Sequence, residues 1–208
     1  MTDLYEKNWI EPTQDRSRRK VALMLKAAKS LAIELGTLDF KMTEVAARAE
    51  VAVGTLYQFF PSRHALIGKL FFDVMAPIDA SVSDVIARAD TLEQLTRRIE
   101  RQMRSHLTLV KSDPALMVIW TTATIDPDVQ LADLENTKRN AEVLTLKLKE
   151  LLGITGSAAD VRATALLVCH LWGAVIRLSV AMPDGQSNRI IKQYARMVSS
   201  HAERWLVS

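Results

Sequence analysis

Four residues that can bind a polar surface lie close together in the uncharged segment 51–61, "VAVGTLYQFFP". Gly54 has no side chain, so a phosphate or a base edge can approach its main chain closely. Thr55 and Tyr57 carry hydroxyl groups, and Gln58 carries an amide that can hydrogen-bond to a base edge. The segment has no charge of its own, so neighbouring residues must supply any attraction to a polyanion.

Basic residues flank this segment and make the front of the chain positive. Residues 1–70 contain 11 Lys+Arg and 8 Asp+Glu, whereas residues 71–208 contain 16 of each. The whole net charge of +3 therefore belongs to the front, where residues 16–29 hold six basic side chains and no acidic one. A positive end on a neutral body favours nucleic acid as a partner. The predicted DNA-contacting residues are Arg16, Arg18, Arg19, Lys20, Lys41, Thr43, Arg48, Gly54, Thr55, Tyr57, Gln58 and Arg63.

Residues that could support catalysis or hold a metal show no suitable spacing. The four histidines, His64, His106, His170 and His201, are scattered and form no HExxH pair. A single cysteine cannot form a thiolate metal site, and the chain has no Gly-rich phosphate loop and no nucleophile elbow. We therefore expect no catalytic residue, no metal, no cofactor and no enzymatic activity.

The compartment is predicted from the same features. One cysteine cannot form an intrachain disulfide, which fits a reducing environment, and the polar N-terminus has no apolar signal segment. Segment 163–182 is long and apolar enough to span a membrane, but it contains His170 and Arg177, and an arginine inside a span is costly. We expect a cytoplasmic protein with no membrane partner, in which this helix is buried.

Composition and periodicity predict an all-α fold of about nine helices. Ala, Leu, Arg, Lys and Glu are plentiful, Gly and Pro number only 7 and 6, and no stretch alternates long enough to require a strand. The expected helices cover about 16–35, 44–49, 62–76, 91–111, 114–124, 127–152, 157–182 and 188–206, and a further short helix lies within 51–61.

Start and stop signals set these boundaries. Thr43 is a predicted N-cap, Ser62 or Pro61 starts the next helix, and Thr91 with Gln94 has the form of a capping box. Two Asp-Pro pairs, at 113–114 and 126–127, have the N-cap and first-turn pattern, whereas Gly36 and Gly153 end helices. Pro77 should kink or interrupt its helix, and segment 183–185 is a predicted turn.

Two short helices joined by a tight turn after a longer packing helix form a helix-turn-helix, whose second short helix enters the major groove of DNA. The run 43–66, "TEVAARAEVAVGTLYQFFPSRHAL", resembles the DNA-binding signature of TetR-type bacterial repressors. The resemblance covers about residues 16–70 and departs from the family pattern at four positions. These positions are Glu50 for a turn glycine, Ala52 for a capping serine, Val53 for a basic residue and Arg63 for a lysine.

The polar residues 1–14 predict a flexible N-terminal arm, although Tyr5, Trp9 and Ile10 could pack on something. The resemblance implies a helix-turn-helix domain (15–62) and a rear domain for ligand binding and dimerisation (63–208). A two-fold dimer would bury the apolar helix 163–182 together with the last helix. The predicted dimerisation residues are Ile190, Ile191, Tyr194, Met197, Val198 and Trp205. The predicted pocket residues, a mixture of large apolar and polar groups, are Phe71, Met75, Met103, His106, Leu107, Met117, Trp120, Thr121, Thr124, Cys169, His170, Trp172 and Arg177.

The favoured function is a one-component transcriptional regulator, most simply a repressor. A homodimer would bind double-stranded operator DNA, and a small hydrophobic effector would release it by favouring another dimer shape. An alternative from a different class is a helical small-molecule carrier whose front domain no longer reads DNA, as residues 50, 52 and 53 would allow.

Overall fold

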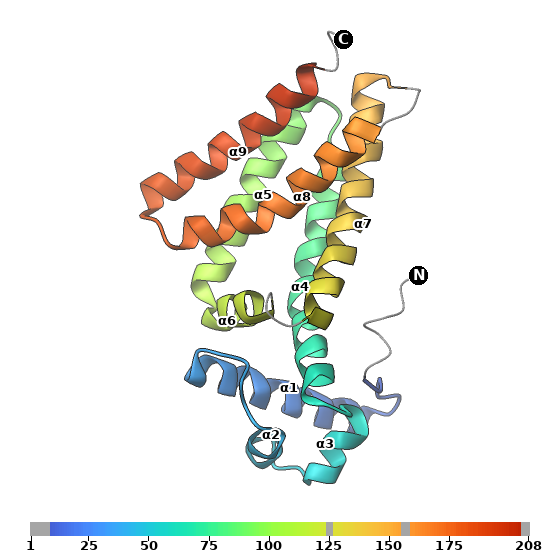
Figure 1. Ribbon diagram of the computed structural model, residues 1–208, viewed down its shortest axis with the longest axis vertical. Helices are drawn as coiled ribbons and strands as arrows, with labels where there is room; N and C mark the ends of the chain where they lie inside the picture. The colour runs from blue at the N-terminus through green and yellow to red at the C-terminus, as the bar shows by residue number, and fades with distance from the viewer. Residues whose placement is uncertain (1–8, 124–126, 155–158, 205–208) are drawn as a thin grey trace. The chain divides into compact units, whose positions relative to one another are not determined.

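The computed structural model describes residues 9–123, 127–154 and 159–204, and within these ranges the chain forms nine α-helices and no strand (Figure 1). The all-α prediction is confirmed. The helices are α1 (Asp15–Leu35), α2 (Met42–Arg48), α3 (Val53–Phe59), α4 (Arg63–Ala87), α5 (Leu92–Ser112), α6 (Pro114–Ala123), α7 (Pro127–Leu152), α8 (Ala159–Val180) and α9 (Asp184–Arg204).

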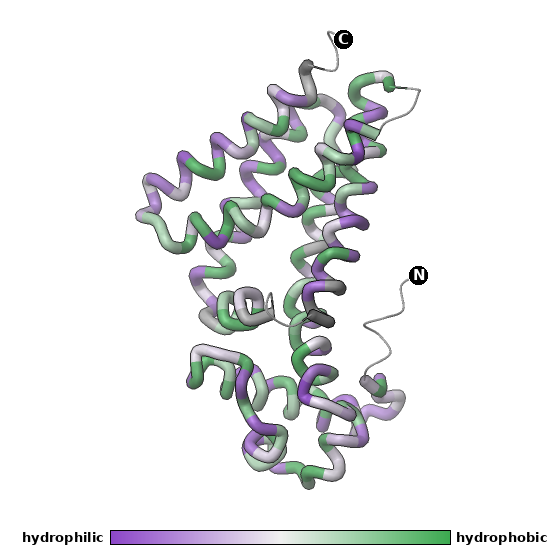
Figure 2. The backbone as a smooth tube through the Cα atoms, viewed as in Figure 1, coloured by the Kyte–Doolittle hydropathy of each residue, from purple (hydrophilic) through white to green (hydrophobic). Residues whose placement is uncertain are grey.

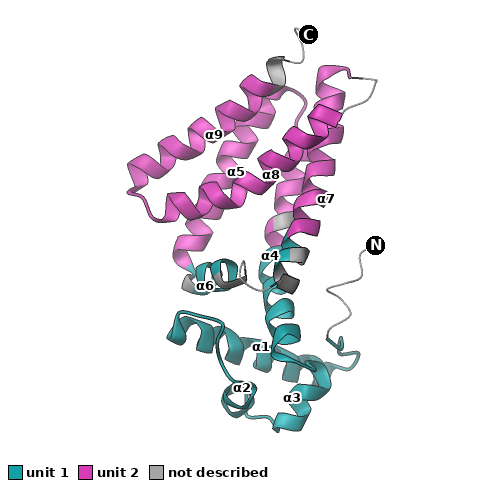
Figure 3. Cartoon of the chain, in the orientation of Figure 1, with its two compact units in different colours: residues 1–76, 113–133 teal, residues 77–112, 134–208 magenta. Residues whose placement is uncertain are grey.

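The chain divides into two compact units (Figure 3). Unit 1 consists of residues 1–76 and 113–133, and unit 2 of residues 77–112 and 134–208. Unit 1 is larger than the predicted helix-turn-helix domain, because it also contains the first part of α4 and all of α6. Helix α6 packs on α1, and Lys29 Nζ of α1 lies 2.6 Å from the carboxylate of Asp113.

Local capping rules predicted several helix ends correctly. The hydroxyl of Ser62 accepts a hydrogen bond from the Ala65 N–H (3.1 Å) before α4. Thr91 Oγ1 accepts one from the Gln94 N–H (3.1 Å) at the start of α5, and Asp113 accepts one from the Ala115 N–H (3.0 Å) before α6. Each cap satisfies an N–H that has no partner inside its helix.

The predicted start of α2 is wrong by two residues. Lys41, not Thr43, is the N-cap, and Thr43 lies inside the first turn. The Glu44 carboxylate reaches back to the Lys41 N–H (2.9 Å), and the side chain of Met42 is buried. These two contacts place the start of the helix N-terminal to Thr43, because they stabilise the residues that precede it in a helical turn.

Helix α4 is not interrupted at Pro77, so of the two predicted outcomes, a kink or an interruption, the interruption is wrong. Met75 on one side of the proline and Ile78 on the other are both buried, so packing holds the helical turn despite the lost N–H. Pro77 nevertheless begins unit 2.

Helix α9 begins at Asp184, so segment 183–185 is the start of a helix and not a free turn. The Pro183 carbonyl accepts hydrogen bonds from the N–H groups of Gln186 (2.9 Å) and Ser187 (3.0 Å). The Ser187 hydroxyl, which is buried, donates to the Ser179 carbonyl of α8 (2.6 Å). An aspartate in the first turn also suits the positive end of the helix dipole.

In unit 2, helices α5, α8 and α9 pack on one another. Their buried side chains include Met103 of α5, Ile176 of α8 and Ile191 of α9. Helix α7 contributes Asn140, which accepts a hydrogen bond from the Ser83 hydroxyl of α4 (2.6 Å). Unit 2 is therefore a helical bundle with an apolar centre and polar links between helices.

Candidate DNA-binding interface and rear-unit pocket

The turn between α2 and α3 has the geometry of a Schellman cap. The Val51 N–H donates to the Ala46 carbonyl (3.0 Å), and the Glu50 N–H donates to the Ala47 carbonyl (3.2 Å). Glu50 occupies the left-handed position with a φ of 53°, where glycine is preferred. The turn is thus kept although its glycine is replaced, and Glu50 carries the backbone strain.

Helix α3 is anchored from one side only. Leu56 is its one fully buried side chain among those described, and Phe60 follows it into the core. Gly54, Tyr57 and Gln58 are exposed on the opposite side. The interpretation of Leu56 as an anchor and of the three exposed residues as available for DNA is consistent with this arrangement.

The start of α3 lacks a side-chain cap, as the alanine at its N-cap position predicted. Ala52 is the N-cap residue, and only its carbonyl takes part, accepting from the N–H groups of Thr55 (2.9 Å) and Leu56 (3.2 Å). The N–H groups that precede these two in the first turn have no acceptor within the helix and suit a phosphate oxygen.

Basic residues surround this helix, and none of the twelve predicted DNA-contacting residues is buried. Arg16, Arg18 and Arg19 are exposed on the first turns of α1, where Arg18 donates to the carbonyls of Pro12 and Thr13 (3.4 Å each). Lys41 and Thr43 are exposed at the start of α2, and Lys20 is half-buried.

Two of the predicted arginines donate hydrogen bonds to acids of the same unit, and Arg18 lies 3.6 Å from the carboxylate of Asp15. Arg48 of α2 donates to the Glu34 carboxylate and to the Ser30 hydroxyl (3.1 Å), both on α1. The hydrogen bond from Arg48 holds the pKa of Glu34 below its ordinary value. Arg63 of α4 donates to the Asp39 carboxylate. A phosphate must compete with these carboxylates for both guanidinium groups.

Within the predicted flexible arm, the structure describes residues 9–14, where Trp9 is packed. Trp9 is only 6% exposed, because it packs against Phe72 of α4. The sequence signal was a large aromatic residue in an otherwise polar segment, but its partner lies some 60 positions further along the chain. Residues 1–8 lie outside the described part of the structure.

The predicted pocket residues fall into two groups, one in each unit. Phe71, Met75 and Trp120 are buried in unit 1, where Met117 and Thr121 are half-buried. Met103, His106, Leu107 and Trp172 are buried in unit 2, where Cys169 and Arg177 are half-buried. Thr124 lies outside the described residues.

Within unit 2, the structure brings His106 and Trp172 together. The Trp172 indole N–H donates to His106 Nδ1 (3.1 Å), joining α5 to α8. Burial lowers the pKa of His106 to about 4, so the ring is neutral at physiological pH. Burial also raises the pKa of the nearby Cys169 thiol to about 12, which leaves it protonated and unreactive.

His170 does not belong to this group, contrary to prediction. It lies one position after Cys169 on α8, but its side chain is exposed. Arg177 lies seven residues, or about two helical turns, further along α8 and is half-buried. His170 is therefore a surface residue.

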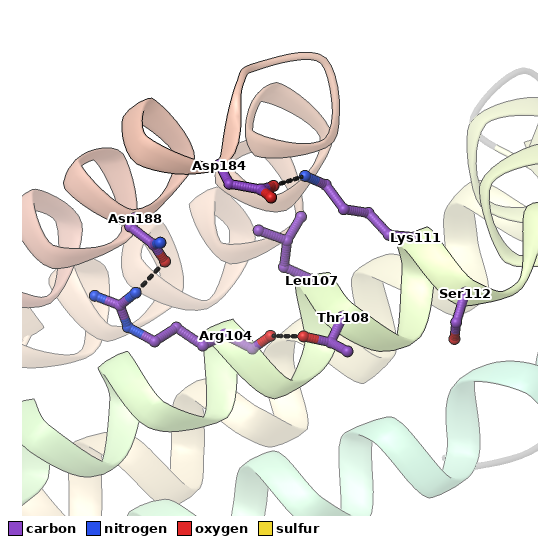
Figure 4. Close-up of a pocket in the computed structure, with 7 residues that line it drawn as sticks. All are labelled: Arg104, Leu107, Thr108, Lys111, Ser112, Asp184 and Asn188. Carbon is purple, nitrogen blue, oxygen red and sulfur yellow. Dashed lines mark hydrogen bonds and ion pairs between the residues drawn. The ribbon is translucent and has the colours of Figure 1, made fainter.

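A cavity of about 450 Å³ is open to solvent between α5 and the start of α9 (Figure 4). Leu107 is the one predicted pocket residue on its wall, and Lys111 Nζ lies 2.6 Å from the Asp184 carboxylate across it. The lining residues are Arg104, Leu107, Thr108, Lys111, Ser112, Asp184 and Asn188. The cations on its wall are matched by acids, because Arg104 also pairs with Glu100 (2.7 Å).

Two family models match the chain in succession. Residues 24–70 match the model described as "Bacterial regulatory proteins, tetR family", and residues 93–202 match "Tetracyclin repressor-like, C-terminal domain". The second match alone covers more than half of the 208 residues. The chain belongs to the TetR family. Its first match spans α2, the turn and α3, the elements that carry the exposed residues described above.

Individual TetR proteins are similar to this chain, one in sequence and others in structure. The HTH-type transcriptional repressor KstR of Mycobacterium tuberculosis is 33% identical over 121 residues, which are 56% of this chain and 51% of KstR. The match thus spans about half of KstR. A TetR-family regulator from Streptomyces coelicolor A3 has a TM-score of 0.65 at 18% identity, with 93% of this chain and 99% of that chain covered. A TetR transcriptional regulator from Rhodococcus sp. RHA1 has a TM-score of 0.56 at 22% identity, with 88% and 97% covered. These structures show that the fold is shared.

Three of the six predicted dimerisation residues lie in the core of unit 2. Ile191, Tyr194 and Val198 are at most 7% exposed, so their side chains pack within their own subunit. Ile190 is half-buried, Met197 is 66% exposed, and Trp205 lies outside the described residues.

Helix α8 is the apolar helix that the sequence singled out, and much of it is not buried within the chain. By length and hydropathy it is the one helix among the described residues that could cross a membrane, and 22% of its most apolar stretch is buried. Figure 2 shows hydrophobic residues recurring along it. Its exposed apolar side chains are Leu167 (61%), Leu171 (44%) and Leu178 (46%). The prediction that this helix is buried is therefore not met within one subunit.

Proposed function

We propose that this protein is a one-component transcriptional regulator that binds operator DNA through α3 as a homodimer. The observation that carries the proposal is the side of α3 opposite Leu56, where Gly54, Tyr57 and Gln58 are exposed. Glycine permits close approach of a phosphate, and the hydroxyl and the amide can hydrogen-bond to phosphate or base edges. The carrier alternative is not favoured, because the left-handed turn that orients α3 is kept despite the substitution at Glu50.

The exposed leucines of α8 support the dimeric state. A row of apolar side chains in water is unfavourable, and burial of each large one against a twin subunit contributes about 1.5–3 kcal/mol at most. Leu167, Leu171 and Leu178 lie four and seven residues apart, which places them along one side of the helix. A two-fold dimer through this side would present two copies of α3 to half-sites about 34–36 Å apart.

Release by a small hydrophobic effector is the regulatory part of the proposal. Unit 2 contains the buried apolar and aromatic residues that such a ligand would contact, including Met103, His106 and Trp172. The chain passes between the units inside α4, between α5 and α6, and inside α7. A ligand that binds one arrangement of these helices better than another would shift the population away from the DNA-bound form. We infer repression as the outcome.

The experiment that tests the proposal is selection of duplexes from a random library by the full chain. Fluorescence anisotropy then compares a selected duplex with its shuffled version at two salt concentrations. We expect tight binding to the selected duplex, binding weaker by a factor of roughly 10³ or more to the shuffled one, and a palindromic consensus. Equal, salt-sensitive binding to both duplexes, or no enrichment at all, would overturn the proposal and favour the carrier.

A further inference from the structure

Residues 9–14, here called the strap, connect the end of α3 to α4 within unit 1. The Ile10 N–H donates to the Phe59 carbonyl (2.9 Å). Phe59 is the last residue of α3, and carbonyl groups in the last turn of a helix have no partner inside it. The strap therefore supplies a C-terminal cap to the helix that faces DNA in the proposed function.

The other attachment of the strap is to α4. Trp9 packs against the ring of Phe72, with ring centroids 6.3 Å apart and a tilt of 44°. The amino group of Lys69 lies 5.6 Å from the Trp9 ring centroid and 5.7 Å from that of Phe72. Both distances are within the range of cation–π attraction.

One carboxylate oxygen joins these groups. Glu11 Oε1 accepts a hydrogen bond from the Trp9 indole N–H (2.7 Å) and lies 2.8 Å from Lys69 Nζ. Asp73 lies 3.0 Å from the same amino group. Only 12% of the Lys69 side chain is exposed, and burial acts against its charge, but the hydrogen bonds to Glu11 and Asp73 outweigh burial and raise its pKa. Trp9, Glu11, Lys69 and Asp73 thus form a half-buried network, in which the two carboxylates accept from the indole N–H and the amino group.

Apart from the turn after α2 and the burial of Leu56 and Phe60, little in the described structure fixes the C-terminal end of α3. The helix is seven residues long, it has no side-chain cap at its N-terminus, and Leu56 is its one fully buried side chain. Helices this short are unstable alone and depend on tertiary contacts. A cap on its last turn, tied to a longer helix, is therefore a substantial part of its support.

We propose that Trp9, Glu11 and Lys69 are positioning residues for sequence recognition, because they hold the end of α3 against α4. The proposal rests on the function proposed above. The three residues need not contact DNA. Without them, α3 would still fold but would be fixed less firmly. It would then present Tyr57 and Gln58 to base edges in a range of orientations.

This role predicts separate effects on specific and non-specific binding. Phosphate contacts from the predicted DNA-contacting residues, such as Arg16 and Lys41, give sequence-independent affinity and its salt dependence. Base contacts from α3 give specificity and depend on its orientation. Loss of the strap should therefore weaken binding to a selected duplex and leave binding to the shuffled duplex and the salt slope unchanged.

Four variants of the full chain test this. Trp9→Ala removes the ring, Lys69→Met removes the charge but keeps the length of the side chain, and Lys69→Arg keeps a cation that can reach Glu11. Lys26→Met, at an exposed position of α1, removes the same charge from unit 1 without touching the strap. We expect Trp9→Ala and Lys69→Met to weaken binding to the selected duplex by about tenfold or more. For Lys69→Arg and Lys26→Met, the affinity for this duplex should stay within about threefold of the wild-type value.

Hydrogen exchange on the DNA-free protein tests the strap independently of any DNA. In Trp9→Ala and Lys69→Met, the amides of α3 should exchange at least about tenfold faster than in wild type, with those of α5 and α9 unchanged. Unchanged exchange in α3, or equal weakening of selected and shuffled duplexes, would overturn the inference. If the wild-type chain enriches no duplex, the proposed function fails, whereas the exchange result still decides whether the strap supports α3.

Discussion

The guanidinium of Arg63, in the first turn of α4, donates a hydrogen bond to the carboxylate of Asp39, in the segment between α1 and α2. Arg48 has the same kind of partner in Glu34. Two cations that sequence reasoning assigned to phosphate contacts are therefore already paired in the free protein. Such pairs are exposed and individually weak, so a phosphate can replace the carboxylate. We therefore expect these acids to lower the affinity for all DNA.

Substitution of Asp39 by asparagine should strengthen DNA binding, because Arg63 no longer has to leave a carboxylate. We expect a gain of about threefold to tenfold for selected and shuffled duplexes alike, since phosphate contacts do not depend on sequence. Arg63→Ala should weaken both. The two changes form a double-mutant cycle. If Asp39→Asn gives the same gain in the Arg63→Ala background, the acid acts through the general field and not through Arg63.

Gly54→Ala tests how closely DNA approaches α3. A Cβ atom built at Gly54 meets no atom within 4 Å in the free protein, so alanine fits and should slightly stabilise the helix. DNA affinity should nevertheless fall by about tenfold if the main chain at this position contacts a phosphate. Gly185→Ala is a matched control, because that glycine in the first turn of α9 also has free space around it. Equal affinities for Gly54→Ala and wild type would exclude a close approach here.

Helix ends were predictable because their signals are local. Ser62, Thr91 and Asp113 each cap a helix through a hydrogen bond to an N–H two or three residues away, so composition over a few residues decides the outcome. The same rules misplaced the start of α9. Proline followed by aspartate and glycine suits a turn and the first turn of a helix equally well, and the buried bond from Ser187 to Ser179 decides between them.

Contacts between distant residues were not predictable. Trp9 could be recognised as a residue with something to pack on, but nothing in its neighbourhood points to Phe72 or Lys69. The apolar residues of α9 present a related difficulty. Tyr194 and Met197 are both large and apolar, yet one is buried and the other is 66% exposed. Periodicity identifies the faces of a helix but not whether its own chain or a twin subunit covers each face.

Glu50→Gly should stabilise the protein. Glu50 has a φ of 53°, and the left-handed region costs a residue with a side chain about 1–2 kcal/mol relative to glycine. Part of that gain is offset by the greater freedom of glycine in the unfolded chain, so we expect the free energy of unfolding to rise by about 1 kcal/mol. Chemical denaturation measures this change in the free energy of unfolding. Glu50→Ala is the control, since alanine bears the same strain and should give no comparable gain.

Leu167→Glu should prevent dimerisation. Leu167 is 61% exposed in the subunit, so a charge there costs nothing when the subunit is alone but would be buried in a dimer through α8. Sedimentation measures the assembly, and we expect the variant to be monomeric and to bind a selected duplex at least about tenfold more weakly. Leu146→Glu is the matched control, because Leu146 of α7 has nearly the same exposure at 60%. A dimeric Leu167→Glu would place the dimer interface elsewhere.

Stability should fall in mild acid because of His106, which lies buried against Trp172. Burial lowers the pKa of His106 from an ordinary value of 6.5 to about 4. Above pH 6.5 the ring is neutral in both states and contributes no pH dependence. Between pH 6.5 and 4 the unfolded chain takes up a proton that the folded chain does not, so the free energy of unfolding decreases as the pH falls. The slope is at most about 1.4 kcal/mol per pH unit, and the total is about 3 kcal/mol.

His106→Gln isolates this contribution. Denaturation of wild type and variant between pH 7 and about pH 4.5 should give a difference in unfolding free energy that shrinks as the pH falls, because only the wild type loses stability through this residue. His170→Gln is the control, since it makes the same replacement at an exposed position of α8. A pH-independent difference for His106→Gln would mean that the folded protein accommodates the imidazolium, for example by admitting water beside Trp172.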